Sequence, residues 1–191
     1  MIPRKYLTGA ILAGGKSSRM GTDKGMMQFN GEYLIEKAIS ALKPCVNDLL
    51  ISSGNRAYDR FGLKRISDII PSQGPISGIH AALQFAAPEP VFILSCDMPW
   101  VTAEVIQHII DSAEDEKLCI PVHRGELQPL CAVYPSMMAE YFRHCILEKD
   151  LSLRRILYQI PRIEIRSEDI PGFTEKYFVN LNTPTDLILN N

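Results

Sequence analysis

The stretch Ile11–Gly25 reads ILAGGKSSRMGTDKG, and it joins an apolar run to a loop with four glycines and three cations. The apolar residues from Leu7 to Ala13 predict a buried first strand. Glycine lets the backbone approach an anion without a Cβ in the way, and successive N–H groups in turn conformations form concave anion sites. Lysine and arginine side chains can add charge-assisted hydrogen bonds. The stretch therefore predicts a phosphate-binding loop after the first strand; the alternative is a solvated surface turn.

Length and composition predict one domain that covers residues 1–191. The chain has 191 residues, of which 46% are hydrophobic, enough for one sizeable core. A net charge of −2 and a pI near 6.1 argue against a partner that is nucleic acid or an anionic membrane, because both need a basic face. The first 24 residues nevertheless carry five cations and one anion, which suits a small anionic ligand.

The expected lack of a signal peptide or membrane span, together with the cysteine pattern, predicts a cytoplasmic protein. No stretch approaches the roughly 20 apolar residues of a membrane-spanning helix. The segment Met1–Ala13 superficially resembles a signal peptide, but it runs into a charged loop, and we expect a first strand there. The five cysteines are scattered without a C-x-x-C pair, which favours reduced thiols over a disulfide framework or a zinc site.

The first half of the chain repeats one pattern, an apolar strand followed by a polar or glycine-containing loop and a helix. This pattern predicts an α/β fold with a mainly parallel sheet. Ligands of such sheets bind beyond the carboxyl ends of the strands, where Gly14, Asp68 and Asp97 fall. After the opening strand, the expected elements are a helix over 34–42, a strand over 48–53, a strand over 64–66, a helix from 79 to 85 after the loop 73–78, a strand over 91–94, and a helix capped by Thr102.

The second half is less regular. The residues His123–Glu126 predict a turn between two strands, as in a hairpin. The other expected elements are strands over 117–122 and 128–134, helices over 136–147 and 153–158, an edge strand around Ile163 and Ile165, and a strand over 178–182 before a short last helix.

Three polar residues at the predicted sheet edge are candidate ligands. Asp97 follows a buried strand directly, and a divalent cation that bridges phosphates usually takes one or two such carboxylates. Asp68 precedes Pro71 and fits a turn or cap residue as well as a ligand. Asn182 can add an oxygen near that metal, although capping the last helix is the alternative that the sequence favours.

Several other chemistries are disfavoured. The four histidines have no zinc-binding spacing, and no local context supports a nucleophilic triad. The glycine-rich loop does not match the G-x-x-x-x-G-K-[ST] pattern of P-loop hydrolases, and the dinucleotide fingerprint G-x-G-x-x-G is absent.

The residues Leu12–Lys24 are similar to the L-A-G-G-x-S-x-R-M-G-x-D-K signature of the molybdenum cofactor guanylyltransferases. The resemblance continues through Gly74–Gly78, Cys96–Pro99 and Asn180–Pro184, so it spans nearly the whole chain. It implies a single Rossmann-like, three-layer nucleotidyltransferase domain. Tyr33 departs from the proline that the family often has there, and we expect this to affect only how the next helix starts.

The resemblance also implies roles for particular residues. The residues that would bind the nucleotide are Leu12, Ala13, Gly14, Gly15, Lys24, Asp68, Gly78 and Asp97. The residues that would act in catalysis are Arg19, Lys24 and Asp97, and Asp97 would hold the cofactor Mg²⁺, with Asn182 as the candidate second metal ligand given above.

The activity that the resemblance implies is transfer of GMP from GTP to the terminal phosphate of molybdopterin, or of its molybdenum-loaded form, with release of pyrophosphate. Transient contacts with cofactor-biosynthesis proteins and acceptor apoenzymes would follow. Related cytidylyltransferases tend to read L-A-A-G, so the Gly14–Gly15 pair favours guanine. The alternatives are a cytidylyltransferase, another sugar- or cofactor-phosphate nucleotidyltransferase, and a GTP-binding protein that delivers cofactor without catalysis.

Overall fold

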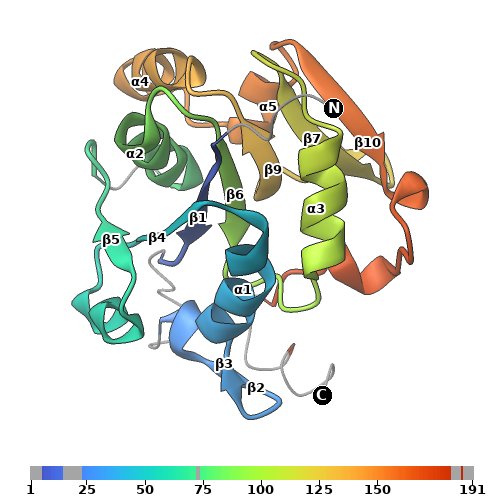
Figure 1. Ribbon diagram of the computed structural model, residues 1–191. Helices are drawn as coiled ribbons and strands as arrows, with labels where there is room; N and C mark the ends of the chain where they lie inside the picture. Colours follow the sequence, from blue (N-terminus) through green and yellow to red (C-terminus); the bar gives the residue numbers. More distant parts are fainter. Residues whose placement is uncertain (1–5, 15–22, 72–73, 182–185, 187–191) are drawn as a thin grey trace.

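An eight-stranded sheet organises the part of the chain that the computed structural model describes, residues 6–14, 23–71, 74–181 and 186 (Figure 1). The strand order is β10-β7-β9-β6-β1-β4-β5, with β8 beside β7. β1 pairs in parallel with β4 and β6, β4 with β5, and β7 with β10, so the predicted mainly parallel sheet is confirmed. The strands are β1 (Thr8–Leu12), β4 (Asp48–Ser52), β5 (Lys64–Ile66), β6 (Val91–Ser95), β7 (Leu118–His123), β8 (Glu126–Leu127), β9 (Cys131–Tyr134) and β10 (Arg162–Arg166).

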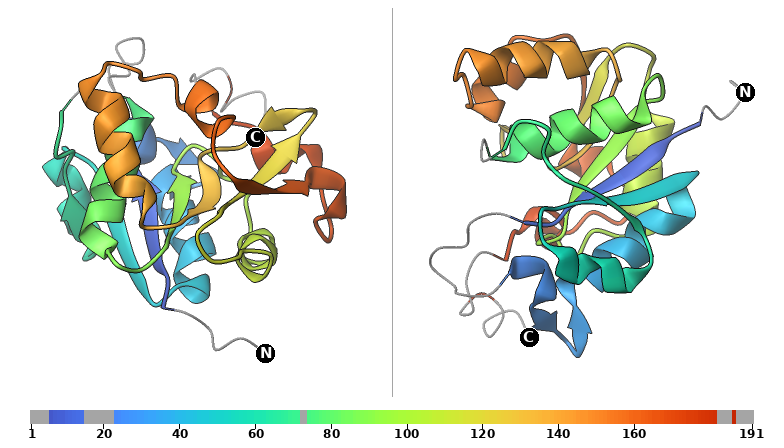
Figure 2. Two further views of the ribbon diagram at one scale, coloured as in Figure 1. Left: turned by 90° about the horizontal axis from the view of Figure 1, so that it is seen from above. Right: turned by 90° about the vertical axis from the view of Figure 1, so that its left-hand side faces the viewer.

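Helices cover both faces of this sheet (Figure 2). Successive residues of a strand point to opposite faces, so Ile11 and Ile51 pack into one core while Ala10 and Leu50 pack into the other. The first core is covered by α1 (Leu34–Leu42) and α3 (Ala103–Asp111), and the second by α2 (Pro75–Ala86), α4 (Met138–Leu147) and α5 (Leu153–Leu157). The result is an α/β fold of three layers.

The second half of the chain adds an antiparallel part to the sheet. β9 runs antiparallel to both β6 and β7, and β7 forms a hairpin with β8. The predicted turn lies between these two strands, where Arg124 and Gly125 adopt positive φ angles of 51° and 77°. β10 pairs with β7 and ends the strand order, which confirms the edge strand predicted around Ile163 and Ile165.

Shorter elements connect these layers. A small hairpin of β2 (Gln28–Phe29) and β3 (Glu32–Tyr33) precedes α1, and the Tyr33 N–H donates to the Glu36 carboxylate at 2.9 Å, which starts the helix. The 3₁₀ helices are η1 (Lys24–Met26), η2 (Lys43–Cys45), η3 (Arg56–Phe61), η4 (Ser167–Asp169) and η5 (Glu175–Phe178).

Two local predictions were wrong. α2 begins at Pro75 instead of Ile79, because Pro75 supplies a helical φ at the first position, and Gly78 therefore lies inside the helix. The strand expected over 178–182 is absent from its described part; η5 ends at Phe178, and residues 179–181 belong to no strand. The predicted cap position is confirmed, since Thr102 is the N-cap of α3, although its side chain makes no capping hydrogen bond.

None of the five cysteines, all of which lie in the described part of the chain, forms a disulfide. Among the described helices, none combines the length and apolar character that crossing a membrane requires.

Candidate functional site

The carboxyl ends of the three central strands bring the predicted loop residues together. Leu12, the last residue of β1, is in register with Ser52 and Ser95. Beyond the strand end, the Leu12 carbonyl accepts the Cys96 N–H at 3.2 Å, and the Ala13 N–H donates to the Ser52 carbonyl at 3.0 Å. The backbone from Leu12 to Gly14 is therefore fixed between the ends of β4 and β6.

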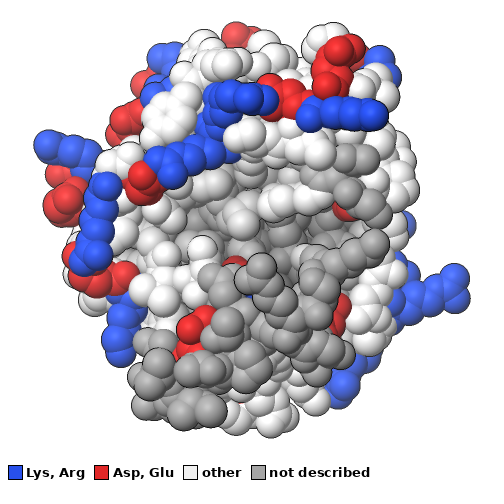
Figure 3. All heavy atoms as spheres, turned by 180° about the vertical axis from the view of Figure 1, so that it is seen from behind, with Lys and Arg blue, Asp and Glu red and all other residues white. Residues whose placement is uncertain are grey.

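Figure 3 shows this end of the sheet, because β1 runs from the front of the molecule to the back (Figure 2, right). Lys and Arg side chains form a band along one margin of this hollowed face.

Asp97 and Lys24, which are 73 positions apart in sequence, form an ion pair on this face. The Lys24 Nζ lies 3.1 Å from Asp97 Oδ2, and the Ser95 hydroxyl donates to Asp97 Oδ1 at 2.6 Å. Asp97 is only 8% exposed, so the carboxylate is held in one orientation by groups on both of its oxygens. Each carboxylate oxygen accepts more than one hydrogen bond or ligand, which leaves capacity for a cation.

Asp68, Gly78 and Leu12 also lie together. An ideal Cβ on Gly78 would be 3.2 Å from Leu12 Cδ2, 3.2 Å from Ser52 Oγ and 3.8 Å from Asp68 Oδ1. Asp68 follows β5 and is half-buried, and this burial raises the pKa of its carboxyl above the ordinary value. The first turns of α2 can approach the ends of β1 and β4 this closely because residue 78 has no side chain.

Three predicted residues, Gly15, Arg19 and Asn182, lie outside the described residues. The neighbour of Asn182 is nevertheless placed: the Leu181 N–H donates to the Asp97 carbonyl at 2.9 Å. Leu181 is also buried with Phe29 and Leu34. The C-terminal segment therefore reaches the same strand end as Lys24.

The sequence prediction missed the support around Lys24. Asp23 accepts hydrogen bonds from Asn55 and Tyr58, which follow β4, and Ser95 orients Asp97. Ser95 does carry a sequence signal, because it ends the buried strand β6, two residues before Asp97. Tyr58 carries no sequence signal, because its contact with Asp23 spans 35 positions and depends on the fold.

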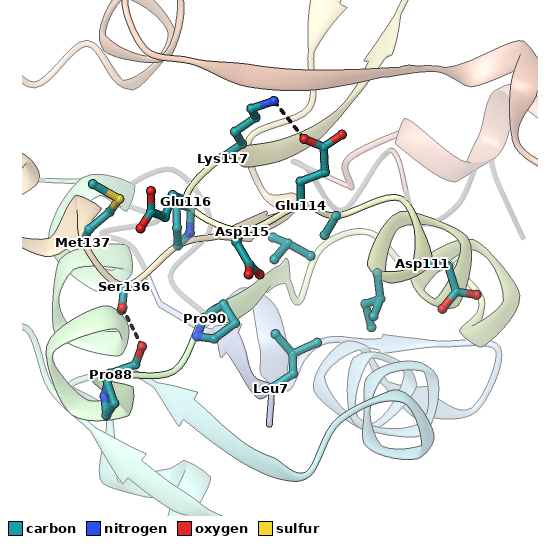
Figure 4. Close-up of a pocket in the computed structure, with 14 residues that line it drawn as sticks. Leu7, Pro88, Pro90, Asp111, Glu114, Asp115, Glu116, Lys117, Ser136 and Met137 are labelled. Atoms are coloured by element: carbon teal, nitrogen blue, oxygen red, sulfur yellow. Dashed lines mark hydrogen bonds and ion pairs between the residues drawn. The ribbon is translucent and has the colours of Figure 1, made fainter. Parts of the chain in front are cut away.

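A second hollow lies at the opposite end of the sheet (Figure 4). Leu7, Pro90 and Lys117 line it, and these residues directly precede β1, β6 and β7. Its other lining residues include Glu114, Asp115 and Glu116, and Lys117 is paired with Glu114 at 2.8 Å. Carboxylates repel a polyphosphate, so this hollow does not suit the anionic ligand that the sequence predicts.

A metal site built from the protein alone is not present in the described residues, where no three His, Cys, Asp or Glu side chains are grouped for it. Mg²⁺ bound with a nucleotide needs fewer protein ligands, since one or two carboxylates plus phosphate oxygens and waters complete its coordination. A single carboxylate such as that of Asp97 would be enough protein ligand for Mg²⁺ bound in this way.

The fold places the protein among the α/β proteins with a mostly parallel sheet, a class whose ligands bind at the carboxyl edge of the sheet. Within that class the chain belongs to the family of MobA-like NTP transferase domains, which residues 9–163 match. It is therefore a member of a nucleotidyltransferase family.

Curated relatives and a solved structure agree with this assignment. A probable molybdenum cofactor guanylyltransferase of Clostridium perfringens is 36% identical over 184 residues, which cover 91% of this chain and 90% of the relative. A protein of the same description from Carboxydothermus hydrogenoformans is 33% identical, with 94% and 92% covered. The crystal structure of molybdopterin-guanine dinucleotide biosynthesis protein A from Archaeoglobus fulgidus is similar with a TM-score of 0.77, at 27% identity and 95% coverage of both chains.

Proposed function

We propose that this protein transfers GMP from GTP to the terminal phosphate of molybdopterin, or of its molybdenum-loaded form, and releases pyrophosphate. The observation that carries the proposal is the Lys24–Asp97 ion pair at the end of β6, beside the fixed backbone of Leu12–Gly14. The names of the relatives, which describe guanylyltransferases of molybdenum cofactor, support the choice of substrates.

The proposed reaction is an exchange at the α-phosphorus of GTP. A terminal phosphate oxygen of the acceptor forms a bond to this phosphorus, and the bond from phosphorus to the oxygen that bridges to the β-phosphate breaks. The electron pair of that bond leaves with pyrophosphate. A phosphate monoester has a second pKa near 6 and is mostly dianionic at neutral pH, so the attacking oxygen needs no general base.

The residues of the chain then have to position two polyanions and neutralise charge. The Lys24 ammonium, 3.1 Å from the Asp97 carboxylate, lies where it can move onto the phosphates of a nucleotide. The backbone of Leu12–Gly14 would hold the nucleotide next to it, with Asp68 and Gly78 on the other side. Gly15 and Arg19 keep their proposed roles in nucleotide binding and catalysis.

Asp97 would hold Mg²⁺, and Asn182 would add an oxygen ligand. When bound, the ion would neutralise negative charge on the phosphates. Ser95 fixes the Asp97 carboxylate by donating to Oδ1, which leaves Oδ2 to exchange Lys24 for the cation.

The test is a pyrophosphate-release assay with GTP and with CTP, each with and without molybdopterin and Mg²⁺. We expect release that requires GTP, molybdopterin and Mg²⁺ together. Asp97→Asn should remove the Mg²⁺-dependent turnover, and Lys24→Ala should lower the rate on the order of 10²-fold if it stabilises developing charge as oxyanion-type donors do. Glu116→Gln, in the hollow at the far end of the sheet, is the matched control and should leave the rate unchanged.

Other outcomes would identify the alternatives. Faster release from CTP than from GTP would make the protein a cytidylyltransferase. Binding of GTP without release of pyrophosphate, even with molybdopterin present, would indicate a non-catalytic delivery protein. An unchanged rate in Asp97→Asn would contradict the assignment of Asp97.

A further inference from the structure

We infer that Tyr58 and Asn55 are positioning residues that hold Lys24 in place for its action on the nucleotide phosphates, through Asp23. This inference rests on the proposed function, because Lys24 is the cation assigned to the phosphates. Neither Tyr58 nor Asn55 belongs to the glycine-rich stretch; both lie after β4, Asn55 as the N-cap of η3 and Tyr58 within that helix.

Asp23 directly precedes Lys24, and its carboxylate is the point where the two segments are joined. Asp23 Oδ1 accepts hydrogen bonds from the Tyr58 hydroxyl and from the Gly25 N–H, the latter at 3.2 Å. Asp23 Oδ2 accepts one from Asn55 Nδ2 at 2.9 Å. Three donors on one carboxylate fix the backbone on either side of Lys24, and hydrogen bonds to an ionised group are about twice as strong as neutral ones.

Both donor side chains have contacts of their own. Tyr58 is fully buried, and its ring lies 6.2 Å from the ring of Phe61. The Asn55 side-chain oxygen accepts the Ala57 N–H at 3.0 Å, and the Asn55 N–H donates to the Ser53 hydroxyl at 3.2 Å. Through Tyr58, Asp23 is therefore attached to the buried core, and Asn55 adds a second bond from the N-cap of η3.

The same segment after β4 also contacts the other flank of the glycine-rich stretch. The Ser52 carbonyl accepts the Ala13 N–H at 3.0 Å, and an ideal Cβ on Gly14 would lie 3.3 Å from the Ser53 hydroxyl oxygen. Residues 52–58 thus set the position of Leu12–Gly14 relative to Lys24. The proposed site needs this fixed spacing, because both parts have to contact the same nucleotide.

The physical reason for this support lies in the lysine side chain. The ε-ammonium is a point charge on a flexible four-carbon stem, so its position depends on where its backbone is held. When a reaction depends on the positions of charged groups, moving one of them by 1 Å can lower the rate by about 10²-fold. The Asp23 anchor reduces the space that the Lys24 ammonium explores.

The test begins with Tyr58→Phe, which keeps the buried ring and removes only the hydroxyl that donates to Asp23. We expect kcat/KM for GTP to fall about tenfold, the effect of losing one hydrogen bond to a charged group. The matched control is Tyr6→Phe, which removes a tyrosine–aspartate hydrogen bond, to Asp48, at the start of β1. That variant should keep the wild-type kcat/KM, and thermal unfolding of both variants records any loss of stability.

A double-mutant cycle then separates positioning from a merely structural role. If Tyr58 acts through Lys24, adding Tyr58→Phe to Lys24→Ala should change kcat/KM by less than about twofold. The same tenfold loss in both backgrounds, or a Tyr58→Phe variant within about twofold of wild type, would overturn the inference.

The dissociation constant of MgGTP, measured on the same four proteins, keeps the inference testable if the proposed function fails. Wild type that binds MgGTP without releasing pyrophosphate would contradict the proposed function alone. The double-mutant cycle would then compare the dissociation constants of MgGTP in place of kcat/KM. Wild type that binds no MgGTP would overturn both the proposed function and the positioning role of Tyr58 and Asn55.

Discussion

An ideal Cβ on Gly25 would lie 2.4 Å from the Tyr58 hydroxyl oxygen and 3.1 Å from two ring carbons of the same residue. Real Cβ contacts are not that short, so a side chain at residue 25 would have to move either the Tyr58 ring or the η1 backbone. Tyr58 is fully buried and cannot turn away. The glycine next to Lys24 is therefore explained by close packing and not by a special backbone angle.

Gly25→Ala should destabilise the protein by about 1–3 kcal/mol, the usual cost of forcing extra atoms into a packed site. Urea unfolding monitored by circular dichroism measures it. Gly54→Ala is the control, because nothing lies within 4 Å of the Cβ that it would add. In a Tyr58→Phe background the cost should be smaller, since the nearest contact atom is gone. Equal losses at residues 25 and 54 would contradict this explanation.

The sequence could predict that Leu12–Gly14, Lys24 and Asp97 lie at one end of the sheet, because each stands next to a recognisable strand or within a recognisable signature. It could not predict Tyr58, whose surroundings in sequence are those of an ordinary surface loop. The contact of Tyr58 with Asp23, 35 positions away, appears only once the strands are placed.

Helix α2 carries two buried polar side chains that have no hydrogen-bond partner among the described residues. Ser77 and His80, three positions apart on α2, are buried, and neither the Ser77 hydroxyl nor either His80 ring nitrogen has a hydrogen-bond partner in the described residues. Burial lowers the pKa of His80 below its ordinary value of 6.5, while Glu140 raises it and Arg143 lowers it, both from α4. The neutral imidazole is thus the form that the folded protein accommodates.

This burial predicts a pH dependence of stability. Between the lowered pKa of folded His80 and the ordinary 6.5, the unfolded chain binds more protons than the folded one. The free energy of unfolding should therefore fall as pH drops below about 6.5, by at most about 1.4 kcal/mol per pH unit, and should be fully recovered above it. Urea unfolding at about pH 7.5 and at about pH 5.5 measures the loss.

Two glutamine variants isolate His80 from the other titrating groups. His80→Gln should reduce the loss of stability between the two pH values relative to wild type. His144→Gln, on the exposed side of α4, should leave that loss unchanged. If His80→Gln loses as much stability as wild type, the pH dependence comes from other groups.

Periodicity placed most helices and strands within a few residues, because burial on one face imposes the spacing of apolar residues. It failed where single contacts override that spacing. α2 starts four residues before its predicted start because Pro75 fits the first helical position. The segment up to Leu181 is not a strand because the Leu181 N–H bonds to Asp97 and its side chain packs with Phe29 and Leu34.

The two ends of the sheet differ in charge and chemistry. The carboxyl ends carry Lys24 and Asp97 next to the glycine-containing backbone, while the amino ends carry the acidic hollow of Figure 4. The topology alone predicts which end binds the ligand. The hollow could not be foreseen, because Leu7, Pro88, Ser136 and the acidic run 114–116 come together only through the order of the strands.

A ligand that binds only the folded protein stabilises the whole molecule, so nucleotide binding should be visible as a shift in thermal unfolding. At a hundred times its dissociation constant, MgGTP should add about 2.7 kcal/mol, which corresponds to roughly 5–10 °C for a protein of this size. Asp97→Asn should reduce the part of the shift that requires Mg²⁺, because it weakens the proposed cation ligand. Glu116→Gln should retain the full shift, since it lies at the other end of the sheet. An equal shift with CTP would argue against guanine preference, and loss of the shift in Glu116→Gln would move the nucleotide site to the acidic end.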